Sequence, residues 1–230
     1  MRFTLTVIIP AAGSGTRMES DVPKPFIKLH QKTILEHTVN AFKQVKQVSR
    51  IVIAVSGDSL QHVTSMFTEQ TEPEILCIEG GSERQHSVYN ALHYAGDADL
   101  VAVHDAVRPF VTGADILACC EAALNTGAAL LAVKAADTVK IVGKTGLVVS
   151  TADRDTVWLA QTPQIFKRPV LEKAFQQAGS SGKMFTDDAS LVEDAGFPVR
   201  VVPGDPRNFK LTYPRDMERA KYMMERPWQN

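Results

Sequence analysis

Residues 7–18 read VIIPAAGSGTRM, and residues 23–26 read PKPF. The apolar, β-branched start predicts a buried strand, and the small residues after it predict a turn whose backbone N–H groups can approach an anion. Arg17 closely follows the second glycine, and Lys24 stands between two prolines that restrict the backbone on both sides. We therefore expect a cation held at a fixed place beside the end of the first strand.

This loop does not match the two commonest phosphate-binding motifs. A P-loop has four residues between its glycines and then Lys-Ser/Thr, and the dinucleotide fingerprint has a small residue where Met18 stands. A lone Gly-x-Gly also fits a purely structural turn. The longer pattern, Gly-x-Gly-x-Arg followed by Pro-Lys-Pro, resembles the signature loop of sugar-nucleotide pyrophosphorylases and cytidylyltransferases, which wraps a nucleoside triphosphate.

Composition limits the class of protein. The chain has 230 residues, 44% of them hydrophobic, and a formal net charge of -1. This length allows a substantial core, and the neutral balance argues against a general nucleic-acid binder. No apolar run approaches about 18 residues, so we expect no membrane span, and the N-terminus lacks a signal-peptide layout. Cys77, Cys119 and Cys120 have no metal-ligand spacing, which predicts buried free thiols and fits a reducing cytoplasm.

Strand and helix patterns alternate along most of the chain. Further strands are expected at residues 50–55, 74–78, 100–103, 128–133 and 199–202, and helices at 33–45, 60–67, 87–94, 114–125, 170–177, 189–195 and 214–225. This alternation implies right-handed crossovers and a mostly parallel sheet with ligands at the carboxyl ends of its strands. We therefore predict an α/β fold: one three-layer, Rossmann-like domain over residues 1–230, with three glycine or acidic loops at one sheet edge.

Residues 138–151 break the alternation. TVKIV and LVVST flank a glycine-bounded turn and predict a β-hairpin. We expect it to project as an arm over about residues 137–157. Because an isolated hairpin is only marginally stable in water, a second copy of the chain is its expected partner surface.

Polar residues follow the strand expected at 100–103. Asp105 either caps the next helix or helps to hold Mg²⁺, and its position beside two phosphate-type loops favours the second interpretation. His104 is expected to be packed and hydrogen-bonded rather than to act as a base. Ser87, near the start of a helix, fits a cap and a ligand contact equally well.

Nine segments, in order and with the expected spacing, resemble the 2-C-methyl-D-erythritol 4-phosphate cytidylyltransferase family. They read PAAGSGTRM, PKPF, TILEHTV, GGSERQHSV, HDAVRPF, ADTVK, TADRDTVWLAQTPQIF, TDDAS and NFKLT. The resemblance implies an enzyme that joins CTP to methylerythritol phosphate and releases pyrophosphate, in non-mevalonate isoprenoid biosynthesis. It also implies Mg²⁺ and a homodimer formed through the arm.

The same resemblance implies roles for individual residues. The expected catalytic cations are Arg17, Lys24 and Lys210, the last reaching the α-phosphate. The expected nucleotide-binding residues are Pro10, Ala11, Ala12, Gly13, Ser14, Gly15, Gly81, Ser82, Ser87 and Asp105. The expected substrate-binding residues are Asp105, Arg108, Thr138, Arg154, Thr162 and Thr186. Mg²⁺ is expected either on Asp105 or on the CTP phosphates alone. Ser82 replaces an Asp of some members, and Arg207 replaces an acidic residue.

The chemistry explains why cations dominate this set. A phosphate monoester is already ionised at neutral pH, so its attack on an anionic phosphorus is opposed mainly by charge repulsion and misalignment. Three alternatives remain: a cytidylyltransferase for another polyol phosphate such as ribitol 5-phosphate, a non-catalytic nucleotide-binding module and, more weakly, a dinucleotide-dependent oxidoreductase. Loss of Lys24 or Arg17 would indicate the non-catalytic module, but both are present.

Overall fold

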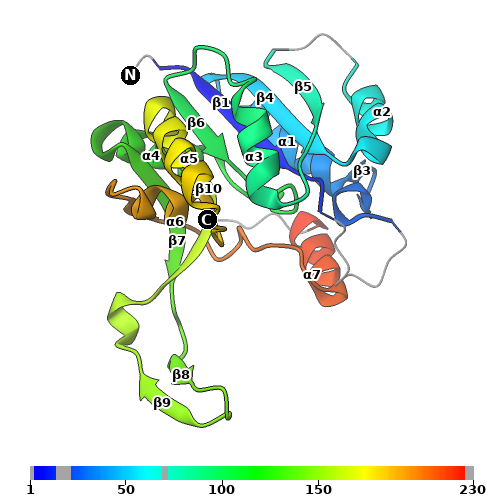
Figure 1. Ribbon diagram of the computed structural model, residues 1–230. Helices are drawn as coiled ribbons and strands as arrows, with labels where there is room; N and C mark the ends of the chain where they lie inside the picture. Colours follow the sequence, from blue (N-terminus) through cyan, green and yellow to red (C-terminus); the bar gives the residue numbers. More distant parts are fainter. Residues whose placement is uncertain (1–2, 14–21, 69–71, 226–230) are drawn as a thin grey trace.

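The computed structural model describes residues 3–13, 22–68 and 72–225. Seven strands form one sheet in the order β11-β7-β10-β6-β1-β4-β5 (Figure 1). Their bounds are β1 Leu5–Pro10, β4 Val48–Val55, β5 Glu74–Glu79, β6 Leu100–Val103, β7 Ala128–Lys134, β10 Trp158–Lys167 and β11 Arg200–Pro203. All neighbours are parallel except at β10, which runs antiparallel to both β6 and β7. The predicted α/β class with a mostly parallel sheet is confirmed, but β10 itself was not predicted.

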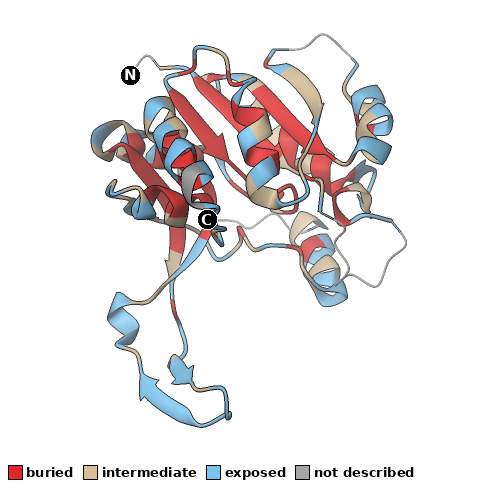
Figure 2. Cartoon of the chain, viewed as in Figure 1, coloured by how far each residue is buried: buried red, intermediate tan, exposed pale blue. Residues whose placement is uncertain are grey.

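Helices cover both faces of the sheet, which gives the three expected layers (Figures 1 and 2). Helices α1 (Ile34–Lys43), α2 (Gly57–Met66) and α4 (Gly113–Thr126) pack on one face, and α3 (Arg84–Leu92), α5 (Arg168–Ser181) and α6 (Asp188–Asp194) on the other. Strand β1 feeds both cores, because successive side chains alternate between faces. Capping boxes start α1 at Thr33 and α4 at Thr112.

The chain's last described helix closes one end of the sheet. Helix α7 (Pro214–Glu225) packs through Ala220 on a small cluster that includes Leu29, Val107 and Leu211. Leu29 belongs to a short ribbon of β2 (Lys28–Leu29) and β3 (Lys32–Thr33), which follows the 3₁₀ turn η2 (Lys24–Phe26). Segments from the beginning, middle and end of the chain therefore meet at this place.

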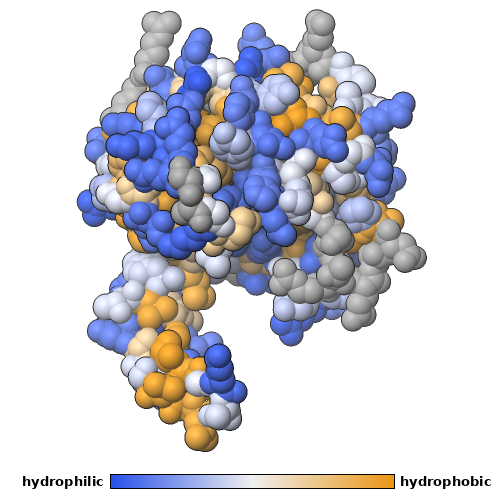
Figure 3. Space-filling model, in the orientation of Figure 1, coloured by the Kyte–Doolittle hydropathy of each residue, from blue (hydrophilic) through white to orange (hydrophobic). Residues whose placement is uncertain are grey.

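Residues 135–157 form the arm, which leaves the sheet after β7 and returns into β10 (Figure 1). It contains β8 (Lys140–Val142), β9 (Val148–Thr151) and the 3₁₀ turn η3 (Arg154–Thr156), and β8 pairs with β9 as the predicted hairpin. The arm extends away from the body and is almost wholly exposed (Figure 2). Its apolar side chains gather on one surface (Figure 3). They include Ile141 (49% exposed), Val142, Leu147 (72%), Val148 and Val149.

The structure shows how far the three cysteines are buried and whether any described helix could cross a membrane. Cys119 and Cys120 are buried in α4, whereas Cys77 is only partly buried, and all three are free. Burial raises the pKa of Cys120 to about 12 and shifts that of Cys119 in the same direction, so neither thiol is a ready nucleophile. Within the described parts of the chain, no helix has the length and apolar character needed to cross a membrane.

Candidate active site

A cleft of about 630 Å³ opens at the carboxyl ends of β1, β5 and β6. The three predicted loops meet there, together with a segment that precedes α7. The lining residues are Pro10, Ala11, Ala12, Gly13, Lys24, Pro25, Gly81, Ser82, Glu83, Arg84, Ser87, Asp105, Ala106, Val107, Lys210, Leu211 and Thr212. Its size and its place at a parallel sheet edge suit a nucleotide.

The glycine turn after β5 is packed tightly against the first loop. A Cβ on Gly80 would lie 2.9 Å from that of Ala12, and one on Gly81 would lie 2.3 Å from that of His86. The Ser87 hydroxyl accepts a hydrogen bond from Gly81 N–H at 3.0 Å and donates one to Glu83 O at 3.1 Å. Because α3 begins at Arg84, Ser87 does not cap this helix; it shapes the turn and lines the cleft.

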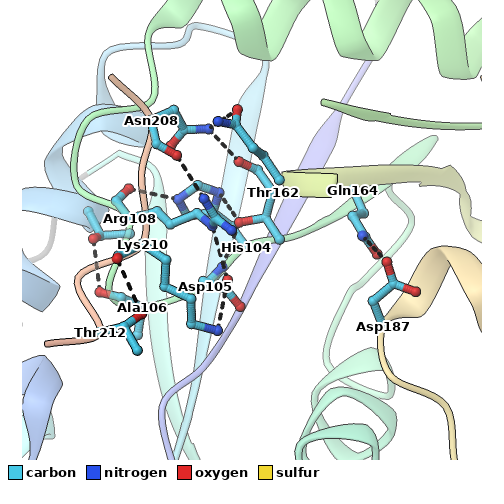
Figure 4. Close-up of polar contacts among 12 residues, drawn as sticks. His104, Asp105, Ala106, Arg108, Thr162, Gln164, Asp187, Asn208, Lys210 and Thr212 are labelled. Atoms are coloured by element: carbon cyan, nitrogen blue, oxygen red, sulfur yellow. Dashed lines mark hydrogen bonds and ion pairs between the residues drawn. The ribbon is translucent and has the colours of Figure 1, made fainter. Parts of the chain in front are cut away.

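Asp105 lies among three cations. Its Oδ2 is 3.1 Å from Lys210 Nζ and 3.1 Å from Arg108 Nε (Figure 4). Its Oδ1 is 3.7 Å from Arg84 Nε. Burial by itself would raise the pKa of Asp105, but these neighbouring cations outweigh it and hold the pKa well below its usual range. The carboxylate therefore stays charged, and it fixes the directions of the cations around it.

His104 connects this loop to Thr162 through the hydrogen bonds of its ring (Figure 4). Its Nε2 donates to Arg108 O at 3.0 Å, because a carbonyl can only accept, and its Nδ1 therefore accepts from the Thr162 hydroxyl at 3.1 Å. Thr162 Oγ1 in turn accepts from Asp105 N–H at 3.0 Å. Burial lowers the pKa of His104 to about 4, so the ring is neutral at pH 7. The expectation of a packed, hydrogen-bonded histidine is correct.

Lys24 is almost completely buried at the base of the cleft. Pro25 stands at the first turn of η2, where its fixed φ suits the helix, and this local geometry directs Lys24 inwards. Lys24 Nζ donates to Thr212 O at 2.8 Å. Arg17, Ser14 and Gly15, which the sequence places in the same loop, lie outside the described residues.

The expected substrate-binding residues are more widely spread. Arg108 contacts Asp105 and donates from Nη1 to Asn208 O at 2.7 Å, while Thr162 is buried in the hydrogen-bond network below. Thr186 is exposed just before α6. Thr138 and Arg154 lie exposed on the arm, away from the cleft lining, and Arg154 Nη1 donates to Ala136 O at 3.3 Å. The single chain therefore does not bring these two arm residues into its own cleft.

Sequence reasoning missed two charged residues and a buried amide. Arg84 lines the cleft and contacts Asp188 at 2.7 Å, and Gln164 binds the start of α6 through Asp187 and Ala189. The available signals were an arginine directly after a glycine turn, a glutamine inside the largely apolar segment 158–166, and an aspartate beside the expected helix start at 186–188. Their partners lie far along the chain, so spacing alone does not reveal them.

The acidic side chains of the cleft indicate how a metal ion could be held there. Of the residues that line the cleft, Asp105 is the acidic side chain placed among the cations, and no group of three or more His, Cys, Asp or Glu able to hold a metal occurs within the described residues. This set does not fit a metal held by the protein alone. It fits Mg²⁺ carried chiefly by phosphate oxygens, with at most one carboxylate added.

Comparison with known proteins gives the family. The family model IspD: 2-C-methyl-D-erythritol 4-phosphate cytidylyltransferase matches residues 5–226. The chain belongs to this family. Its similarity to individual 2-C-methyl-D-erythritol 4-phosphate cytidylyltransferases extends over nearly the whole length. It is 42% identical to the one from Symbiobacterium thermophilum, covering 98% of this chain and 94% of that protein. It is 40% identical to the one from Desulforamulus reducens, covering 96% of each.

Solved structures agree with this assignment. The crystal structure of 4-diphosphocytidyl-2C-methyl-D-erythritol synthase from Anaerococcus prevotii superposes with a TM-score of 0.86, at 29% identity, over 98% of this chain and 100% of that one. The 2-C-methyl-D-erythritol 4-phosphate cytidylyltransferase family therefore accounts for both the fold and the nine sequence segments.

Proposed function

We propose that the chain transfers the cytidylyl group of CTP to 2-C-methyl-D-erythritol 4-phosphate. The products are 4-diphosphocytidyl-2-C-methyl-D-erythritol and pyrophosphate, a step of non-mevalonate isoprenoid biosynthesis. The observation that carries the proposal is the cleft itself, where Lys24, Lys210 and Arg84 converge beside two tightly packed glycine and alanine turns. Family membership supplies the identity of the two substrates.

The reaction needs alignment and charge rather than a base. An oxygen of the acceptor phosphate bonds to the α-phosphorus of CTP, and the bond from that phosphorus to the bridging oxygen breaks to release pyrophosphate. The monoester attacks in its ionised form, so the barrier is set by repulsion between anions. Lys24 and Arg17 would stabilise charge on the triphosphate, and Lys210 would reach the α-phosphate.

The cleft offers separate places for the two substrates. Ala12 and Gly13 would offer backbone N–H groups to the triphosphate, and Gly81, Ser82 and Ser87 would contact the base and ribose. Asp105 and Arg108 would stand between nucleotide and acceptor. Bound Mg²⁺ would supply charge neutralisation at the phosphate oxygens, and Asp105, which lines the cleft beside Lys210, would offer it one carboxylate.

The arm supports a homodimer. Its exposed apolar side chains and its small size leave the hairpin without a core of its own, so a second copy is the economical partner. In such a dimer Arg154 and Thr138 would reach the cleft of the opposite subunit, where a guanidinium can hold a phosphate with two hydrogen bonds. Buried free thiols accord with a cytoplasmic enzyme.

A pyrophosphate-release assay tests the proposal. Purified chain, CTP and Mg²⁺ are mixed with methylerythritol phosphate or, in a parallel reaction, with ribitol 5-phosphate. We expect rapid release with the first acceptor and a rate at least about a hundredfold lower with the second, as expected when an acceptor leaves site groups unpaired. Comparable rates would point to a broader polyol phosphate cytidylyltransferase, and absence of release with both would contradict the activity.

A further inference from the structure

Arg84 is the cleft cation with no role in the reaction as described so far. It is the first residue of α3, directly after the glycine turn, and its guanidinium is partly buried. Nη1 lies 2.7 Å from Asp188 Oδ2 and Nε lies 3.7 Å from Asp105 Oδ1. One planar side chain thus faces two carboxylates, one in the cleft and one at the start of α6.

Asp188 depends on this arginine. Its side chain is only 2% exposed, and its Oδ2 is paired with Arg84 Nη1 at 2.7 Å. Burial raises the pKa of Asp188, and Arg84 opposes that shift. A buried carboxylate is retained only where it is paired, so the ion pair to Arg84 fixes where this end of α6 can lie.

The segment before α6 is held to the same helix by a neighbouring residue. Gln85 donates to Lys183 O at 3.3 Å and accepts from Phe185 N–H at 3.0 Å. Arg84 and Gln85 therefore bind the two ends of residues 183–188. Thr186, which the family resemblance assigns to the acceptor phosphate, lies between these attachments.

On the far side, the start of α6 is attached to the sheet. Gln164 Nε2 donates to Asp187 Oδ2 at 2.7 Å (Figure 4). Gln164 Oε1 accepts from Ala189 N–H at 2.8 Å. Gln164 belongs to β10, two residues after Thr162. Helix α6 thus has a fixed support in the sheet, and the link from its start to Asp105 runs through Arg84.

We propose that Arg84 is a positioning residue that sets the distance between Asp105 and the Thr186 segment, and so determines affinity for the acceptor phosphate. It acts through Asp188 rather than by direct contact with the nucleotide. Lysine cannot replace it, because the three donors of an ammonium group share one nitrogen, whereas Arg84 reaches the two carboxylates from two separate nitrogens of a rigid plane. This inference rests on the proposed transfer reaction.

The test is steady-state kinetics with each substrate varied in turn. Arg84→Lys, Asp188→Asn and the double variant are compared with the wild type. Arg50→Lys is the matched control, since Arg50 forms an ion pair with Glu74 at 2.7 Å outside the cleft lining. We expect each single change to raise KM for methylerythritol phosphate about tenfold and KM for CTP less than about twofold. The double variant should be no worse than the poorer single variant, since both remove one link.

A second variant protects the test against misfolding. Gln85→Ala removes the other attachment without leaving a buried charge, and it should raise KM for the acceptor about threefold, with an unchanged thermal melt. A rise in KM for CTP alone would make Arg84 a nucleotide contact and overturn the inference. Additive effects of Arg84→Lys and Asp188→Asn in the double variant would also overturn it, as would unchanged kinetics of the variants at Arg84, Asp188 and Gln85. If the wild type itself forms no product, the proposed function fails and this inference fails with it. If the wild type is active and the variants match it, only the inference fails.

Discussion

Lys24 donates a hydrogen bond from Nζ to the carbonyl oxygen of Thr212 at 2.8 Å, between residues 188 positions apart in the chain. Nearby, Leu211 N–H donates to Val107 O at 2.9 Å. The segment before α7 is therefore bound both to the first loop and to the loop after β6. The position of the Lys24 charge is determined by tertiary structure and not by its own loop alone.

Replacing Lys24 by alanine is expected to lower kcat about a hundredfold, which corresponds to roughly 3 kcal/mol of lost transition-state stabilisation. The reason is that a preorganised charge next to the triphosphate is removed. Lys28→Ala is the control, because Lys28 is exposed two residues beyond η2. Rate measurements at saturating substrates, beside a thermal melt, check the effect. Full activity of Lys24→Ala would show that the first loop has been misinterpreted.

Removal of divalent metal is expected to stop turnover. Excess EDTA should abolish pyrophosphate release, and added Mg²⁺ should restore it, because a divalent cation on the phosphate oxygens neutralises the negative charge that opposes attack. Undiminished release in EDTA would contradict this prediction.

Among the four common nucleoside triphosphates, CTP is expected to be used fastest. The base would lie against the turn of Gly81 and Ser82, whose backbone is held by the Ser87 hydroxyl and would therefore present fixed donors and acceptors to the base edge. Competition assays with ATP, GTP and UTP at equal concentration check this preference. Equal rates with all four nucleoside triphosphates would contradict the proposal that this turn contacts the base.

His104 is expected to make folding stability depend on pH. Its pKa in the folded chain is about 4, below the ordinary value of roughly 6.5, so the unfolded chain binds the proton first. The contribution is complete above about pH 6.5 and is lost as the pH falls towards 4, amounting to about 3 kcal/mol. Urea unfolding of wild type and His104→Gln between pH 4.5 and 7.5 measures it.

In that experiment the stability difference between wild type and His104→Gln should shrink as the pH decreases. The exposed His93 on the outside of α3 provides a control position, and His93→Gln should keep the wild-type dependence. A difference that stays constant across the range would mean that His104 remains able to take up a proton inside the fold.

Mixing two inactive variants tests the arm. Lys24→Ala lacks a charge at the triphosphate, and Arg154→Ala lacks one at the acceptor. If each cleft borrows Arg154 from its partner, a mixed dimer has one site without either group and one intact site. Random exchange makes about half of the dimers mixed, so activity should return to about a quarter of wild type.

Subunit exchange is verified by mass spectrometry of the intact dimers. If Arg154 serves its own subunit, every site keeps one defect and the mixture stays inactive. A monomer in that measurement would contradict the arm-mediated homodimer directly.

Most of the sheet could be predicted because its strands carry continuous apolar, β-branched runs. Strand β10 could not, since Gln161, Thr162, Pro163 and Gln164 interrupt its apolar pattern. In the fold these polar side chains have partners from distant segments: Gln161 donates to Asp205 O, and Gln164 to Asp187. Tertiary hydrogen bonds thus replace the local signal on which strand prediction depends.

The candidate active site, like the sheet, was only partly predictable from the sequence. Loops that follow predicted strands were located correctly, because parallel strands place their carboxyl ends together. Arg84 was overlooked because its role depends on Asp188, which lies in another helix. Thr162 was assigned to substrate, which stays a prediction. Its hydroxyl also accepts from Asp105 N–H and contacts His104, a network that no spacing in the sequence reveals.

Lys134 and Trp158 face each other as a register pair of β7 and β10, and Ala135 N–H donates to Val157 O at 3.1 Å. The chain therefore leaves the sheet and re-enters it at one point, at a separation that a two-residue turn can span. Everything between these residues is a closed insertion whose length and composition can change without altering the strand pairing beneath the cleft. If the proposed homodimer forms through the arm, a chain with a short turn in place of residues 135–157 should be a monomer, and it would also lack Thr138 and Arg154.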